Sequence, residues 1–173
     1  MAEEVETLCE GRHLLLLSRR GWEYAEHRTA KEAVMVIALT EKGEIVLVEE
    51  FRPAVNAAVV SPPAGLVGDE GPEEAVAAAR RELAEETGCE AESFELLARG
   101  PGSAGQSSEM VLFFLARGAR RTGLQAPQDR DVIRVHTVPV TRMLEWARQR
   151  EAEGILIDPK VWAGVYLAGL FTR

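Results

Sequence analysis

The alternation of apolar and polar positions predicts a series of short β-strands in the first half of the chain. Two of these runs pair around a turn at residues 19–21, and two more are joined by a tight hairpin at residues 41–43. The last run is less regular and ends where Ser and two Pro residues follow one another. The predicted strands of this half are residues 13–18, 22–27, 33–40, 44–51 and 55–60.

Helical periodicity first replaces this alternation at residues 72–87, where apolar residues recur on one side. Pro72 stands at or near the first helical position, and Gly88 fits a left-handed C-cap. Thr141 is expected to cap a second helix that runs to about residue 153, and Asp158, followed by a proline, to cap a third. Three further strands are predicted at residues 94–98, 110–116 and 132–138.

The segment from Arg81 to Gly88 carries the most informative chemistry in the chain. Glu82, Glu85 and Glu86 stand at i, i+3 and i+4, which places three carboxylates on one helix face within about one turn. Like charges this close repel, and Mg²⁺ or Mn²⁺ relieves the repulsion because hard cations prefer carboxylate oxygens. A solvated Glu-rich face would give the same string, so the flanking residues have to decide between the two interpretations.

The flanks favour a metal site, since a glycine-rich loop at residues 63–74 runs into this helix. Together, loop and helix resemble the signature of the Nudix hydrolases, G-x5-E-x7-R-E-U-x-E-E-x-G-U, in which U is a bulky aliphatic residue. The matching positions are Glu73, Arg81, Glu82, Leu83, Glu85, Glu86 and Gly88.

Two positions depart from that signature. Cys89 stands where the final aliphatic residue is expected, and the leading glycine would fall on Val67. Gly65 and Gly68 are the nearest glycines, and Gly65 is expected to be the equivalent one because Pro-Ala-Gly-Leu resembles the usual lead-in. Either the loop before the helix is then two residues longer than standard or the helix start is longer, and both alternatives leave the role of Glu73 open.

The resemblance implies an α/β (α+β) chain with the Nudix fold, a mixed β-sheet sandwiched between helices. It covers roughly residues 33–171. We therefore expect a Nudix hydrolase domain at residues 31–173, preceded by an N-terminal extension of residues 1–30 that contains the first β-hairpin. A chain of 173 residues is long enough to bury a substantial core of this kind.

Other segments resemble the nucleoside-diphosphate-sugar branch of the family, which includes the ADP-ribose pyrophosphatases. They are the leading hairpin, residues 48–55 with the Pro-Pro-Ala-Gly that follows, the loop of residues 103–109 and the strand at residues 133–136. In that branch the N-terminal hairpin often joins a homodimer, so a homodimer is implied here. Ser61 stands where these enzymes commonly carry a glutamate, which prevents the substrate from being carried over.

The activity implied is metal-dependent hydrolysis of a pyrophosphate bond in a small nucleotide substrate, above all ADP-ribose or a related nucleotide sugar. The products would be a nucleoside monophosphate and a sugar phosphate. Arg81 is expected to be structural, holding Glu85 or a nearby loop. Glu73 is expected to be structural as well, helping to position the metal ligands without binding the metal itself. The expected ligands of Mg²⁺ (or Mn²⁺) are Glu82, Glu85, Glu86 and the backbone carbonyl of Gly65.

A base should orient or deprotonate the attacking water, and the resemblance places that base differently among family members. Glu109 lies in a loop of small residues, and Asp131 and Asp129 precede the strand at residues 132–138. These loop carboxylates are candidates alongside Glu85, because loops can move toward a bound substrate. A turn or capping role is the alternative for each loop acid.

Arg52 is the candidate phosphate contact outside the helix, because a guanidinium offers paired donors to phosphate oxygens. The alternative is a surface ion pair with Glu49 or Glu50. Phe51 and Trp22 are candidates for stacking on the base of a nucleotide, with burial in the core as the alternative.

Composition narrows the class of ligand and the expected cellular compartment. The net charge of −8 argues against a general nucleic-acid binder, which needs a basic surface. Cys9 and Cys89 make no disulfide framework, and a reducing, cytoplasmic compartment is expected. No run approaches the length of a membrane span, and the acidic first residues do not resemble a signal peptide.

Two other functions stay open. The same fold could cleave a dinucleotide, coenzyme A or a nucleoside triphosphate, although the hairpin disfavours the small triphosphate enzymes, which usually lack one. A non-catalytic ligand-sensing Nudix domain is the second alternative, and the intact set of one arginine and three glutamates disfavours it. The sequence leaves the moiety beyond the diphosphate and the number of metal ions undetermined.

Overall fold

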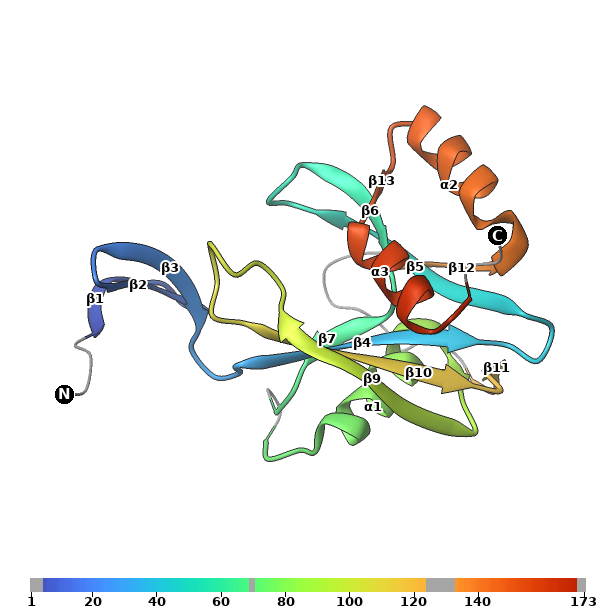
Figure 1. Cartoon of the computed structure of the whole chain (residues 1–173), viewed down its shortest axis with the longest axis horizontal. Helices are drawn as coiled ribbons and strands as arrows, with labels where there is room; N and C mark the ends of the chain where they lie inside the picture. The colour runs from blue at the N-terminus through green and yellow to red at the C-terminus, as the bar shows by residue number, and fades with distance from the viewer. Residues whose placement is uncertain (1–4, 69–70, 124–132, 171–173) are drawn as a thin grey trace.

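The computed structural model describes residues 5–68, 71–123 and 133–170, and it places a mixed β-sheet between helices (Figure 1). The strand order is β13-β6-β5-β4-β10-β9, with β12 beside β5 and β7 beside β4. The β4–β10 and β6–β13 pairs are parallel, and the other pairs are antiparallel. The strands of this sheet are β4 (Glu32–Leu39), β5 (Glu44–Arg52), β6 (Ala57–Ser61), β7 (Ala64–Leu66), β9 (Ser93–Pro101), β10 (Met110–Arg117), β12 (Arg134–Pro139) and β13 (Leu156–Ile157).

Helices cover both faces of the sheet because the side chains of its central strands point alternately to opposite sides. On β4, Val34 and Val36 join the apolar core under helix α1 (Ala75–Thr87). Ile37 belongs instead to a second core on the opposite face. That core is covered by the 3₁₀-helix η1 (Val140–Arg142) and by helices α2 (Met143–Ala152) and α3 (Pro159–Leu167).

The first strands of the chain form a separate sheet that extends away from the main one (Figure 1). It consists of β1 (Val5–Glu10), β2 (Leu14–Arg19) and β3 (Trp22–His27). β3 contacts the loop before β10, where Ala25 N donates to Gln106 O at 2.8 Å and Ser108 N donates to Ala25 O at 3.1 Å. A two-stranded ladder of β8 (Cys89–Glu90) and β11 (Arg120–Arg121) follows α1.

Turn and cap signals of the sequence are confirmed where they are local. Gly43 closes the β4–β5 hairpin with φ 72°, and Gly88 ends α1 with φ 68°, both in the left-handed region that favours glycine. Asp158 caps α3 by accepting a hydrogen bond from Lys160 N at 2.8 Å.

Other boundaries were predicted wrongly. Helix α1 begins at Ala75 rather than at Pro72, which rules out a longer helix start and leaves the extra residues to the preceding loop. Thr141 does not cap α2, because it lies within η1 and Arg142 occupies the N-cap position. The strand expected from residue 55 starts only at Ala57, since Asn56 has a left-handed φ of 51°.

Further differences concern strands. The strands β1, β7, β8, β11 and β13 were not predicted. β12 is first described as a strand at Arg134 rather than at residue 132, which lies outside the described residues. In the described part of the chain, no helix is long and apolar enough to cross a membrane.

Candidate active site

Helix α1 turns two of its three clustered glutamates toward the protein interior. Glu82 and Glu86 are 8% and 7% exposed, whereas the side chain of Glu85 is 40% exposed. Buried carboxylates are costly unless they are paired, hydrogen-bonded or bound to a cation. The burial of Glu82 and Glu86 therefore favours a binding site for a cation or a donor group and argues against a merely solvated helix face.

Strand β7 packs its backbone directly against these carboxylates. The Ala64 N–H donates to Glu86 Oε2 at 3.0 Å. A β-carbon added at Gly65 would overlap the carboxylate of Glu82, so only glycine allows this close approach. β7 itself is held in place by antiparallel pairing with β4, in which Gly65 lies opposite Val34.

Burial raises the pKa of Glu86 from its ordinary value of 4.5 to about 8, opposed by the hydrogen bond from Ala64 and reinforced by the negative charges of Glu82 and Glu50. Glu50 lies on β5 and was not predicted as a site residue. A signal for it existed, because residues two apart on a strand share a face and Glu50 therefore faces the same side as Arg52. The Arg52 guanidinium contacts Glu50 Oε1 at 2.5 Å.

Arg81 connects the loop before α1 to the carboxylates on the helix. Its Nε and Nη2 donate to the two oxygens of Glu73 at 3.2 and 3.1 Å, and Nη2 also donates to Leu66 O at 3.2 Å. Its Nη1 donates to Glu82 at 2.7 Å and to Glu85 at 3.2 Å. The hydrogen bond from Arg81 lowers the pKa of Glu73, and the same bond raises the pKa of Arg81.

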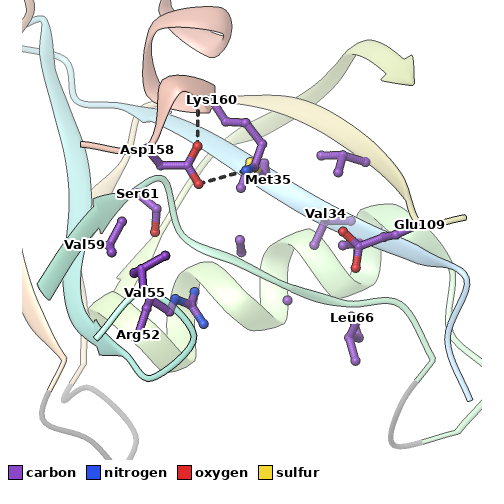
Figure 2. Close-up of a pocket in the computed structure, with 14 residues that line it drawn as sticks. Val34, Met35, Arg52, Val55, Val59, Ser61, Leu66, Glu109, Asp158 and Lys160 are labelled. Carbon is purple, nitrogen blue, oxygen red and sulfur yellow. Dashed lines mark hydrogen bonds and ion pairs between the residues drawn. The ribbon is translucent and has the colours of Figure 1, made fainter. Parts of the chain in front are cut away.

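A pocket of about 470 Å³ opens beside β7 (Figure 2). Arg52, Gly65 and Glu109 line it, so the structure brings together a candidate phosphate contact, a candidate metal-ligand backbone and a candidate base. Ser61 lines the same pocket and is 4% exposed. A concave site with a few polar groups set among apolar ones is typical of small-molecule binding.

Other predicted residues lie elsewhere. Phe51 and Trp22 are 44% and 64% exposed, and neither lines this pocket. The indole Nε1 of Trp22 instead donates to Gly105 O at 3.1 Å, which ties the N-terminal sheet to the loop that leads to Glu109. Asp131, and with it the alternative Asp129, lies outside the described residues.

A divalent cation suits this donor set. Among the residues that the structure describes, no three His, Cys, Asp or Glu side chains are already arranged to hold a metal ion. Two of the helix carboxylates, Glu82 and Glu85, accept hydrogen bonds from Arg81. The buried Glu82 and Glu86 nevertheless supply hard oxygen donors whose mutual repulsion, increased by Glu50, a cation would relieve. The absence of a side chain at Gly65 lets the backbone of β7 come close to the carboxylate of Glu82.

The arrangement can bind an anionic ligand and act on it. Arg52 provides a fork of donors in the pocket wall, and the carboxylates behind β7 can hold a cation that offsets the ligand's charge. Glu109 adds a carboxylate at the far end of the same pocket. These are the elements needed to bind phosphate groups and to take up a proton from water.

Comparison with known proteins agrees with this geometry. The family model described as the NUDIX domain matches residues 29–156. A methanol dehydrogenase activator of Bacillus methanolicus is 37% identical over 99 residues, covering 57% of this chain and 52% of that protein. An ADP-ribose pyrophosphatase of Bacillus subtilis (strain 168) is 39% identical over 84 residues, covering 49% and 44%. The chain spans about half the length of the curated relatives it matches.

Solved structures show the same fold. The crystal structure of an ADP compounds hydrolase superposes with a TM-score of 0.70 and 21% sequence identity, covering 95% of this chain and 89% of that one. At this identity the likeness concerns the fold alone. It confirms the mixed sheet with helices on both faces that the sequence predicted.

Proposed function

The chain belongs to the Nudix family, and from that premise we propose that it hydrolyses the pyrophosphate bond of a nucleoside diphosphate linked to a second moiety. The observation that carries the proposal is the set of buried carboxylates packed against Gly65, next to a pocket that contains Arg52. The match to an ADP-ribose pyrophosphatase supports ADP-ribose or a related nucleotide sugar as the substrate. A nucleoside monophosphate and a sugar phosphate would be released.

Mg²⁺ or Mn²⁺ is the proposed cofactor. Glu82, Glu86 and the carbonyl of Gly65 would hold it, and the more exposed Glu85 would join them on release from Arg81. When bound, such a cation neutralises phosphate charge and makes a neighbouring water more acidic.

The chain's own residues account for binding and proton transfer. Arg52 would hold the phosphate oxygens, since Glu50 engages only part of its guanidinium fork. Water attacks one phosphorus, the bond from that phosphorus to the bridging oxygen breaks, and a proton of the water passes to a carboxylate. Glu109, which lines the pocket, is the proposed acceptor, and Asp131 is the alternative acceptor.

A hydrolysis panel tests the proposal. The protein would be assayed with Mg²⁺ or Mn²⁺ against ADP-ribose, other nucleotide sugars, dinucleotides, coenzyme A and nucleoside triphosphates. Release of AMP from ADP-ribose, lost in Glu86→Gln and retained in the exposed control Glu74→Gln, is the expected result. Equal rates in the unaltered protein and in Glu86→Gln would refute the proposed role of the carboxylates.

A homodimer is proposed through the N-terminal sheet. Leu8, Leu14 and Leu16 of β1 and β2 are 40%, 50% and 39% exposed, and apolar side chains grouped this way favour burial against another surface. Light scattering should give twice the chain mass of 19.0 kDa. A monomeric mass at micromolar concentration would exclude the dimer.

A second candidate function is activation of an alcohol dehydrogenase. It is favoured by the likeness to the methanol dehydrogenase activator. Adding the chain to a methanol dehydrogenase assay, with and without Mg²⁺, would reveal it as a higher rate of alcohol oxidation.

A further inference from the structure

The first residues of α3 form one wall of the pocket because of a strand that precedes them. β13 pairs in parallel with β6, with Leu156 opposite Val59 and Ile157 opposite Val60. The Asp158 N–H then donates to Val60 O at 2.9 Å. This pairing fixes the start of α3 beside the end of β6, where Ser61 also lines the pocket.

Tight packing keeps α3 in this position. Val161 and Val165 are buried against the sheet. A β-carbon at Gly164 would overlap the side chain of Ile37 on β4, so helix and strand approach more closely than any larger residue allows. The polar groups at the start of α3 are therefore held by a rigid element, as a selective binding site requires.

Asp158 and Lys160 form an ion pair within that wall (Figure 2). Lys160 Nζ lies 2.9 Å from Asp158 Oδ2, while Asp158 Oδ1 accepts the Lys160 N–H at 2.8 Å. The side chain of Lys160 is 36% exposed and that of Asp158 is 19% exposed, so solvent and ligands can reach both. In Figure 2 the pair lies at the top of the view, apart from Glu109 at the right.

The chemistry of the pair suits hydroxyl groups better than phosphates. The carboxylate cancels the charge of the ammonium at short range, which removes most of the attraction for a further anion. Lys160 Nζ keeps two of its three donors, and Asp158 keeps acceptor lone pairs, so a hydroxyl can both donate and accept here. Among the described residues lining the pocket none is aromatic, which disfavours a nucleotide base at this position.

We propose that Asp158 and Lys160 bind the hydroxyl groups of the sugar on the far side of the diphosphate and thereby select hydroxylated substrates. The inference rests on the proposed function, because it assigns one end of the same pocket. Arg52 would hold the diphosphate, and the adjoining Asp158–Lys160 pair would contact the sugar attached to it.

The test compares two substrates that differ only beyond the diphosphate, ADP-ribose and the ethyl ester of ADP. Lys160→Met should lower kcat/KM for ADP-ribose about tenfold or more, the effect of losing one charged hydrogen bond, and should leave the ethyl ester nearly unchanged. Asp158→Asn, which retains an oxygen for capping α3, should give the same pattern. Lys42→Met, an exposed lysine in the β4–β5 turn, is the control.

Calorimetric binding of the non-hydrolysable α,β-methylene analogue of ADP-ribose gives a readout without catalysis. Weaker binding in Lys160→Met than in Lys42→Met would support the inference. An equal loss on both substrates, or no loss on either, would overturn it while leaving the proposed hydrolysis intact. If the unaltered protein cleaves neither substrate but binds the analogue, the proposed function fails, and the binding comparison still decides the role of the pair.

Discussion

The carboxylate of Glu82 lies against the α-carbon of Gly65 and occupies the space that a β-carbon would take at this position. Gly65→Ala should therefore displace Glu82 or push β7 away from α1. Misplacing a catalytic group by about an ångström costs on the order of 100-fold in rate. We expect kcat/KM with Mg²⁺ to fall by about that factor and the affinity for Mg²⁺, measured by calorimetry, to weaken.

Gly100→Ala is the matched control. Gly100 lies on β9, and a β-carbon there would meet nothing within 4 Å. It should retain activity and metal affinity. If Gly65→Ala behaves like this control, then the close approach to Glu82 does not matter for function.

The raised pKa of Glu86 predicts a stability that depends on pH. Between its ordinary pKa of 4.5 and the folded value of about 8, the folded chain holds a proton that the unfolded chain has lost. The free energy of unfolding of the metal-free protein should therefore fall as pH rises through this window, by up to about 1.4 kcal/mol per pH unit. Urea unfolding at pH 5, 6, 7 and 8 measures the slope.

Glu86→Gln provides the comparison, because glutamine does not titrate. The difference in slope between the two proteins isolates the contribution of Glu86 from that of all other groups. Saturating Mg²⁺ should flatten the curve of the unaltered protein, since a cation replaces the proton among the carboxylates. Identical slopes in both metal-free proteins would contradict a raised pKa at this residue.

The sequence reveals those parts of the site that depend on helical spacing. Glu82, Glu85 and Glu86 could be placed on one helix because three residues within one turn need no tertiary information. Glu50 could not be placed the same way, since its proximity to Glu86 arises from packing β5 against α1. The interpretation of Phe51 as a base-stacking residue finds no support in the pocket, because strand alternation turns it away from Arg52.

In the fold, too, features set by the local sequence could be predicted, whereas features set by tertiary pairing could not. The turn at Gly43 and the cap at Asp158 follow from local conformational preferences and were predicted correctly. β7 escaped prediction because it has only three residues, Ala64–Leu66, and is a strand only through its pairing with β4. β1 is exposed along its whole length, so it carries no periodicity that burial would impose.

Glu73 should influence catalysis although it lies outside the pocket of Figure 2. Glu73→Gln removes the paired bond that orients Arg81, which in turn holds Glu82 and Glu85. We expect kcat/KM to fall about tenfold, with at most about 1 kcal/mol of lost stability because the pair is partly solvated. Steady-state kinetics beside Glu74→Gln, an exposed neighbour without a capping bond, separate this effect from the loss of charge alone.

The contact of α3 with β4 predicts a mutation and its rescue. Gly164→Ala should destabilise the fold by about 1–3 kcal/mol, because the added methyl overlaps Cδ1 of Ile37. Ile37→Val removes that carbon but keeps Cγ1, which would lie 2.7 Å from the added methyl, so the double variant should recover part of the loss. Thermal unfolding of the single and double variants measures the coupling, and purely additive effects would show that the overlap is relieved elsewhere.

Elements that shape the pocket and its loops lie outside the segment that the family model matches. The matched segment, residues 29–156, starts after β3 and stops before α3. An engineer who trimmed the gene to that segment would keep every helix carboxylate. The product would nevertheless lack Asp158 and Lys160 and the strand whose backbone anchors the loop ahead of Glu109. Grafting or shortening this protein should therefore preserve both flanks, since the proposed sugar-binding pair and the strand that contacts the loop ahead of Glu109 lie outside the matched segment.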